Sequence, residues 1–195
     1  VEVEEIENNV TIKNTINETV QSSMINAENS GTTIRIAIAI AALSGGDTTL
    51  TGDESLRKRP MKPILDALET MGVNTESDGG KPPIHIDGKI KGKEISINGD
   101  ISSQFISALL IIAPRLPDGL VINVKGDLVS KPYVDLTIAI MKKFGVAVEI
   151  EEDYKKYVVK HQIYQPTTFS IPSDFSNLAL LLVANVLLGD GLTIE

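Results

Sequence analysis

The chain has 195 residues, of which 42% are hydrophobic, so it can bury a substantial core as one domain. Its formal net charge of −8 argues against a nucleic-acid partner, because such binding surfaces carry a clustered positive field. The sequence contains no cysteine, which excludes disulfides and thiolate metal sites and favours a cytoplasmic location. The longest apolar run, residues 178–188, is shorter than the roughly 18 residues that a membrane span requires, so no membrane partner is expected.

The first predicted elements in chain order are a strand at residues 10–13, a helix at 34–43 and a helix at 60–71. The segment 34–43 alternates isoleucine with other residues, as a strand would, but its alanines and a capping Ser30 or Thr32 favour a helix. Residues 60–71 carry one apolar stripe with charged residues opposite, which predicts a helix that covers the core from one side.

Further along the chain, alternating residues predict strands with one wet face at 84–87, 94–98 and 168–171. Residues 105–113 and 178–188 are apolar all round, so we expect helices that are buried on every side. Helices that are buried on every side, together with strands that expose one face to solvent, predict that the helices lie inside and the sheets outside.

A repeat of 72 to 74 residues organises the whole chain. The matching pairs are Gly52-Asp53 with Gly126-Asp127, Arg59-Pro60 with Lys131-Pro132, and Gly72-Val73 with Gly145-Val146. The predicted fold class is therefore α/β, built from βαβαββ units with helices inside and sheets outside. We expect a single domain over 1–195, with units at 1–90, 91–165 and 166–195. The first unit lacks its beginning and the last lacks its end, so we interpret the chain as part of a longer protein.

Polar residues gather just before several predicted helices. The first N–H groups of a helix lack internal partners and lie at the positive end of its dipole, so a helix start attracts anions. Ser102, Ser103 and Gln104 add two hydroxyls and an amide at one such start, although Ser102 could simply cap its helix. Ser130 and Tyr133 lie at another start, where a tyrosine is more often half-buried packing than a ligand contact.

Two other helix starts carry features that suit an anion. Residues 57–59 are Arg-Lys-Arg, the densest positive cluster in the chain, placed before Pro60 at an expected helix start. A guanidinium fork binds carboxylate or phosphate with two hydrogen bonds, although three solvated cations remain the alternative. Gly31 opens the alanine-rich helix, where a missing side chain lets a ligand approach the backbone. Neither histidine lies at metal-ligand spacing, so no metal site is predicted.

Four motifs in order resemble the EPSP synthase family of 3-phosphoshikimate 1-carboxyvinyltransferases. They are residues 29–35 (NSGTTIR), 52–60 (GDESLRKRP), 102–105 (SSQF) and 130–133 (SKPY). The resemblance covers nearly the whole chain, which is about half the length of such an enzyme. It implies most of an N-terminal substrate-binding domain in an enolpyruvyl transferase-like, inside-out α/β barrel.

The resemblance also implies an activity, which is transfer of the enolpyruvyl group of phosphoenolpyruvate to the 5-hydroxyl of shikimate 3-phosphate. That step belongs to the shikimate pathway of aromatic amino-acid biosynthesis and implies no cofactor or metal. By motif position, Ser102, Ser103, Gln104, Ser130 and Tyr133 would hold shikimate 3-phosphate. Gly31, Arg59 and Gln104 would meet phosphoenolpyruvate or the inhibitor glyphosate.

The acid–base groups of the family belong to its second domain, so we expect no catalytic residue here and no turnover by this chain alone. The resemblance implies that second domain as a partner and a monomeric full-length enzyme. One alternative is the related transferase that acts on UDP-N-acetylglucosamine, whose usual cysteine has no counterpart near residues 57–60. Another is a non-catalytic anion-binding module.

Overall fold

The computed structural model describes residues 2–7, 9–13, 22–171 and 175–189. The chain divides into two compact units, residues 1–165 and 166–195. The first unit begins with an antiparallel hairpin of β1 (Glu2–Ile6) and β2 (Asn9–Lys13), in which Val3 lies opposite Ile12. The hairpin confirms the strand predicted at 10–13.

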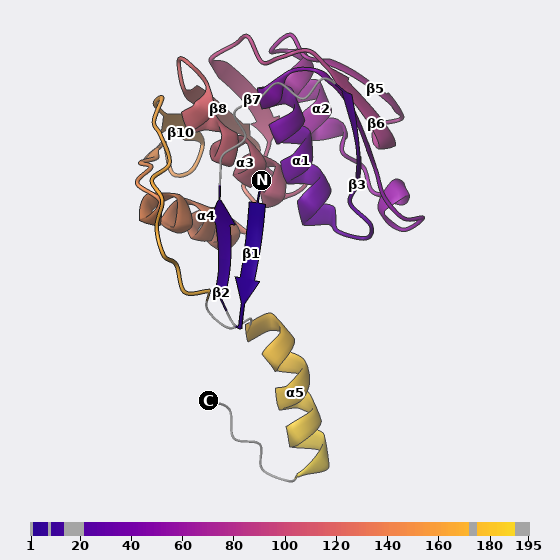
Figure 1. Cartoon of the computed structure of the whole chain (residues 1–195), viewed down its shortest axis with the longest axis vertical. Coiled ribbons are helices and arrows are strands. Elements are labelled where there is room, and N and C mark those ends of the chain that lie inside the picture. The colour runs from indigo at the N-terminus through magenta and orange to yellow at the C-terminus, as the bar shows by residue number, and fades with distance from the viewer. Residues whose placement is uncertain (1, 8, 14–21, 172–174, 190–195) are drawn as a thin grey trace. The chain divides into compact units, whose positions relative to one another are not determined.

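Residues 22–159 fold into two copies of the predicted order of strands and helices (Figure 1). The first copy comprises β3 (Ser22–Asn26), α1 (Gly31–Ser44), β4 (Asp47–Thr51), α2 (Lys62–Glu69), β5 (Asn74–Asp78) and β6 (Lys81–Asp87). The second comprises β7 (Glu94–Asn98), α3 (Ser103–Ile112), β8 (Leu120–Lys125), α4 (Lys131–Lys143), β9 (Glu149–Glu151) and β10 (Lys156–Val159). Short 3-10 helices lie at Leu56–Lys58 and Ala113–Arg115. The βαβαββ prediction is confirmed for both copies.

Each copy forms a four-stranded sheet with the same connectivity. The strand orders are β3-β4-β6-β5 and β7-β8-β10-β9. In each sheet the first two strands are parallel and the remaining pairs are antiparallel. A parallel pair needs a crossover connection, which α1 and α3 provide.

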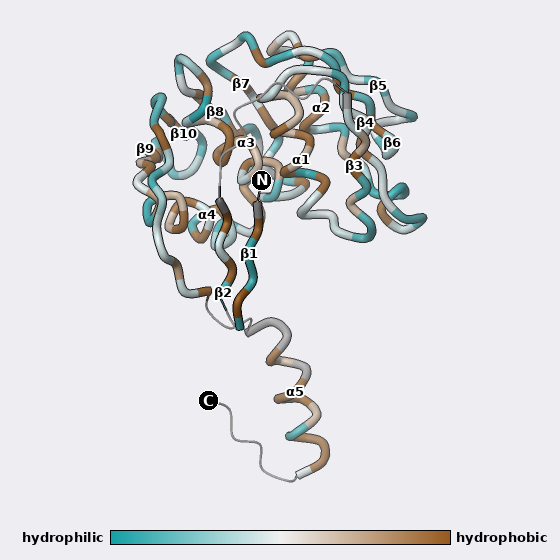
Figure 2. Tube along the Cα trace, in the orientation of Figure 1, coloured by the Kyte–Doolittle hydropathy of each residue, from teal (hydrophilic) through white to brown (hydrophobic). Residues whose placement is uncertain are grey.

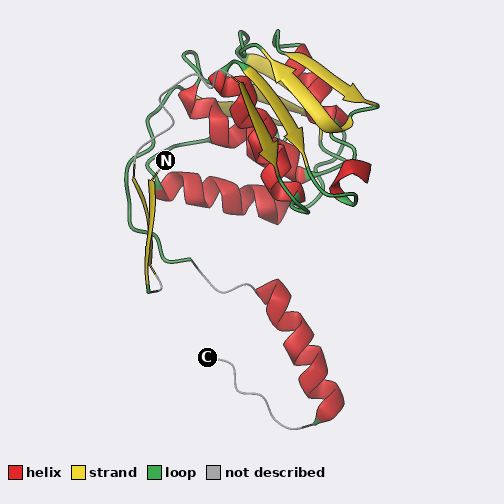
Figure 3. Cartoon of the chain, turned by 45° about the vertical axis from the view of Figure 1, so that its right-hand side comes forward, coloured by secondary structure: helices red, strands yellow, loops and turns green. Residues whose placement is uncertain are grey.

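Helices α1 and α3 lie inside and the sheets outside, as the patterning predicted, whereas α4 buries only Val134 and Met141 (Figure 3). Most of α3 is buried, with Phe105, Ile106 and Leu109 fully inaccessible. Strand β6 alternates exposed and buried residues, so one face of its sheet contacts the helices and the other contacts water. Hydrophobic residues are frequent along α1 and α3 (Figure 2), and in the sheets the buried residues include Ile84, Ile86, Ile95 and Ile97.

Helix α2 begins at Lys62, two residues later than predicted, and it has Pro63 in its first turn. Arg59 is extended because it precedes Pro60, and a residue before proline avoids the helical region. The backbone N–H of Met61 then donates to Gly80 O at 2.7 Å. The predicted stripe is confirmed and is composed of the buried residues Met61, Ile64, Leu65, Leu68 and Met71.

The second unit contains α5 (Phe175–Leu188), the helix predicted from residue 178. Its predicted burial is wrong, because Val186 and Leu187 are 80% and 78% exposed. The strand predicted at 168–171 is also wrong, because these residues form no regular structure. Among the described residues of 166–195, no other helix or strand is present to cover α5 or to pair with 168–171. No described helix is both long and apolar enough to cross a bilayer.

Two tyrosines, one fully buried and one partly buried, allow a matched test of the core. Tyr157 in β10 is fully buried, and its hydroxyl has no hydrogen-bond partner in the described part of the chain. Tyr164 is partly buried, and its hydroxyl donates to Ile111 O at 2.9 Å. We expect Tyr157→Phe to raise the free energy of unfolding by about 1 kcal/mol, and Tyr164→Phe to lower it by about 1 kcal/mol. Urea unfolding near neutral pH measures both changes, and a destabilised Tyr157→Phe would contradict the expectation.

The same pair predicts a pH dependence. Burial raises the pKa of Tyr157 above its ordinary value, and burial raises the pKa of Tyr164 to about 12. A tyrosine whose pKa is raised in the folded state contributes its full stabilisation below the pKa of the unfolded chain, which is about 10. That stabilisation is lost as the pH rises above this value. Tyr157→Phe should therefore lose less stability than the wild-type chain between about pH 9 and 11. Equal losses in repeated urea titrations across that range would contradict this prediction.

Candidate anion-binding site

The start of α1 is capped as the sequence predicted. Ser30 is extended, and its Oγ accepts a hydrogen bond from Thr33 N at 3.1 Å. Gly31, the first helical residue, is buried. A Cβ at Gly31 would lie 2.8 Å from Nη1 of Arg35 and 2.8 Å from Nη1 of Arg59. Two guanidinium groups therefore flank one point beside this glycine.

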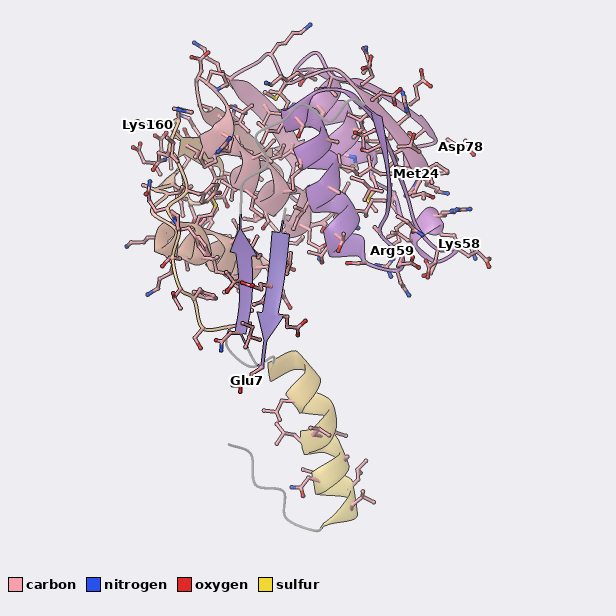
Figure 4. The ribbon with its side chains drawn as sticks, viewed as in Figure 1. Glu7, Met24, Lys58, Arg59, Asp78 and Lys160 are labelled. Atoms are coloured by element: carbon pink, nitrogen blue, oxygen red, sulfur yellow. The ribbon has the colours of Figure 1, made fainter. Side chains whose placement is uncertain are left out.

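The structure places Arg59 beside α1, and the prediction that residues 57–59 form a cationic start of α2 is wrong. Arg57 and Lys58 lie in the 3-10 helix at Leu56–Lys58, Arg59 is extended, and α2 begins only at Lys62. Lys58 pairs with Glu54 at 2.8 Å, which leaves it a solvated ion pair. Arg59 instead donates from Nη2 to Asn29 Oδ1 at 3.4 Å. Figure 4 shows Lys58 and Arg59 projecting from this segment.

Gln104 joins the starts of α3 and α1. Its Nε2 donates to Thr32 Oγ1 at 3.0 Å, and its Oε1 accepts from Arg35 Nη1 at 2.5 Å. The structure thus brings together three predicted site residues, Gly31, Arg59 and Gln104. We define the anion cluster as these three residues together with Thr32 and Arg35.

Ser102 and Ser103 lie at the same helix start as Gln104. Ser102 is extended, and its Oγ accepts from Gln104 N at 3.3 Å, so Ser102 caps α3. Its hydroxyl proton stays available, because a capping serine acts as an acceptor. Ser103 is only 4% exposed, which makes it one of the few buried polar side chains of the described chain.

Ser130 and Tyr133 lie at the start of α4, one helix further on. Ser130 has a left-handed backbone with φ of 57°, and its side chain makes no capping hydrogen bond. Tyr133 is 61% exposed, so the half-buried alternative for this residue is wrong. The helices α3 and α4 are joined by Ser107 and Thr137, whose hydroxyls lie 2.9 Å apart. In the described part of the chain, no hydrogen bond links Ser130 or Tyr133 to the anion cluster.

Lys131 lies between Ser130 and Tyr133 in the sequence, and its side chain contacts the turn between β9 and β10. Its Nζ lies 4.7 Å from the Tyr154 ring centroid and 3.6 Å from Asp153 Oδ1. The hydroxyl of Tyr154 donates to Asp135 at 2.9 Å, and this bond raises the pKa of Tyr154. These contacts hold the first turn of α4 in place and engage the ammonium group of Lys131. The polar side chains that remain there for a ligand are Ser130 and Tyr133.

The anion cluster holds two cations without a counterion. Burial, and then the charge of Arg59, lower the pKa of Arg35 below its ordinary value. The ion pairs found in the described part of the chain involve neither arginine. A bound anion beside Gly31 would relieve this repulsion, since opposite charges attract most strongly where water is partly excluded.

Arg35 and Thr32 are the cluster residues to which sequence reasoning assigned no contact with a ligand. Arg35 stands four residues after Gly31, so one helical turn returns its side chain toward the helix start. That spacing was readable in the sequence. The partner of Arg35 was not, because Gln104 is 69 positions away.

Other polar features of the structure lie apart from the cluster. No three acidic or histidine side chains converge within the described ranges in a way that could hold a metal ion. His85 Nδ1 lies 3.4 Å from Asp47 Oδ1 across β4 and β6, a carboxylate partner that the sequence had not indicated. A groove of about 750 Å³ runs between α2 and β7, and it contains none of the five cluster residues.

Comparison with known proteins identifies a relationship over the whole chain. The family model described as EPSP synthase (3-phosphoshikimate 1-carboxyvinyltransferase) matches residues 1–195. A 3-phosphoshikimate 1-carboxyvinyltransferase of Nitrosopumilus maritimus is 55% identical over 192 residues, covering 98% of this chain and 46% of that protein. One of Methanosphaera stadtmanae is 40% identical over 181 residues, covering 89% of this chain and 42% of that protein.

A solved structure is similar as well. The EPSP synthase of Acinetobacter baumannii matches with a TM-score of 0.67 and 27% identity, covering 83% of this chain and 36% of that one. The chain therefore spans less than half the length of the relatives that it matches.

Gly31→Ala tests the anion cluster directly. The new Cβ would lie too close to both guanidinium groups, so at least one arginine must move away from the glycine. We expect affinity for inorganic phosphate to fall about tenfold, which is the loss of one hydrogen bond to a charged group. Calorimetric titration measures this change.

The thermal midpoint serves as the control, because alanine favours a helix more than glycine does and should leave the fold at least as stable. Unchanged phosphate affinity in a folded Gly31→Ala protein would place the bound anion elsewhere.

Proposed function

Since the chain belongs to the EPSP synthase family, we propose that it is the substrate-binding part of a 3-phosphoshikimate 1-carboxyvinyltransferase. Such an enzyme transfers the enolpyruvyl group of phosphoenolpyruvate to the 5-hydroxyl of shikimate 3-phosphate. The observation that supports the proposal most is Gln104, which joins the starts of α1 and α3 beside Gly31 and two arginines. Both substrates are anions, so this concentration of donors suits them.

The phosphoenolpyruvate side of the proposal uses Gly31, Arg59 and Gln104. Phosphoenolpyruvate carries a carboxylate and a phosphate, and each can accept two hydrogen bonds from a guanidinium fork. Arg59 is exposed and has one long contact, to Asn29 at 3.4 Å, so little must be broken before it turns to a ligand. The missing side chain of Gly31 lets both guanidinium groups approach the start of α1, where a Cβ would lie 2.8 Å from each of them.

The shikimate 3-phosphate side uses Ser102, Ser103, Gln104, Ser130 and Tyr133. The serines at the start of α3 add hydroxyl donors where the helix dipole already favours a phosphate. Ser130 keeps its hydroxyl free of the helix cap, and the exposed Tyr133 offers an aromatic face and a polar tip. In this proposal α3 lies between the two substrates, and Gln104 contacts both.

Catalysis in this proposal needs groups beyond the anion cluster. Enolpyruvyl transfer requires a positioned acid or base within hydrogen-bond reach, and the five cluster residues include no carboxylate. We therefore propose that the remaining length of a full-size relative supplies those groups as a second domain, with the two halves closing over the substrates. The 195-residue chain should bind without turnover.

Titration of the 195-residue chain with shikimate 3-phosphate, and separately with UDP-N-acetylglucosamine, tests the substrate. We expect heat of binding for the first ligand alone. Binding of the nucleotide sugar alone would favour the related transferase. Binding of inorganic phosphate with equal strength, and of neither substrate specifically, would favour a non-catalytic anion-binding module.

Ser103→Ala should weaken binding of shikimate 3-phosphate by about 1 to 3 kcal/mol, because a hydroxyl donor to charge is lost. Ser107→Ala is the matched control on the same helix, since Ser107 is bonded to Thr137 rather than to the helix start. The control should bind as the wild type does. If the Ser103 variant also keeps full affinity, Ser103 is a structural residue of α3.

A further inference from the structure

We propose that Arg35 is a positioning residue, which fixes the orientation of the Gln104 side-chain amide so that its NH2 group faces the bound anion. The inference rests on the proposed function, because it takes Gln104 to be a donor to the substrate. It assigns a role to Arg35, which lies in the motif at residues 29–35 but received no role from the resemblance.

Arg35 is held more firmly than the neighbouring Arg59. Its Nη1 donates to Gly31 O at 3.2 Å and to Gln104 Oε1 at 2.5 Å. Its guanidinium lies over the ring of Phe105, 5.1 Å from the centroid, and that ring is fully buried. Arg35 is half-buried between α1 and α3 and is held in place, whereas Arg59 is exposed and its side chain can turn toward a ligand.

The amide of Gln104 has two chemically opposite ends, and either could face the anion after a rotation about its last bond. Thr32 cannot select between them, because a hydroxyl both donates and accepts. Arg35 can, because a guanidinium only donates and therefore requires the amide oxygen. With the oxygen held at Arg35, the NH2 group faces Thr32 at 3.0 Å.

This orientation matters for an anion beside Gly31 and Arg59. One N–H of the amide is bonded to Thr32, and the second remains for the ligand. In the reversed orientation, the amide oxygen of Gln104 would face the anion. Its partial negative charge would repel the anion instead of attracting it. Arg35 thus adds to anion selectivity without touching the anion.

The free protein offers a direct readout. In 15N-labelled chain, the side-chain NH2 signals of Gln104, identified by their loss in Gln104→Ala, should show a nuclear Overhauser contact with Thr32. Arg35→Met should shift these signals and remove that contact, whereas Arg35→Lys keeps a donor and should keep it. Arg57→Met, which removes an exposed cation outside the cluster, is the matched control and should change nothing. Unchanged Gln104 signals in both Arg35 variants would overturn the proposal.

A double-mutant cycle on phosphoenolpyruvate binding separates positioning from direct contact. Arg35→Met alone should weaken binding about tenfold, and Arg35→Lys should restore most of the loss. In the Gln104→Ala background, Arg35→Met should weaken binding much less than tenfold, because only the attraction between its charge and the anion remains to be lost. The same tenfold loss in both backgrounds would make Arg35 a ligand of the anion and would overturn the proposal.

Failure of the proposed function is distinguishable from failure of this inference. If the wild-type chain binds no phosphoenolpyruvate, the substrate assignment fails, while the Gln104 signals still decide whether Arg35 orients the amide. If phosphoenolpyruvate binds but the Gln104 signals are unchanged in the Arg35 variants, only this inference fails.

Discussion

The parallel pairing of the first two strands in each sheet is the constraint on which the rest of the structure depends. Parallel neighbours cannot be joined by a tight turn, so β3 must reach β4 through α1, and β7 must reach β8 through α3. Each of these helices therefore begins just beyond the carboxyl end of an edge strand. Repetition of one connection in two copies places two helix starts side by side, where Gln104 meets Thr32 and Arg35.

The charge of the site follows from that placement. Two helix starts contribute partial positive charge, and two guanidinium groups beside Gly31 add to it in a chain whose net charge is −8. Holding Arg35 half-buried near Arg59 disfavours its charged form, which lowers its pKa. A bound anion at this site would offset the repulsion between the two guanidinium groups.

Sequence patterns predicted the features that depend on near neighbours. The apolar stripe of α2, the all-round burial of α3 and the capping of α1 by Ser30 were readable because helical periodicity and capping act within a few residues. The burial of α5 and the strand at 168–171 were predicted wrongly, because both depend on a covering or pairing element rather than on local pattern. The single-domain boundaries stay predictions, and so do the substrate roles of Gly31, Arg59, Ser102, Ser103, Gln104, Ser130 and Tyr133.

The sequence by itself determined the repeated order of strands and helices, the family and the positions of most polar groups at helix starts. Only the tertiary structure decided which of those groups meet. Arg59 lies with Asn29, 30 positions away, and Arg35 lies with Gln104, 69 positions away. Local pattern cannot indicate such partners, because the crossover of the chain between parallel strands determines which helix starts become neighbours. The packing of those helices then determines which end of an amide faces the ligand.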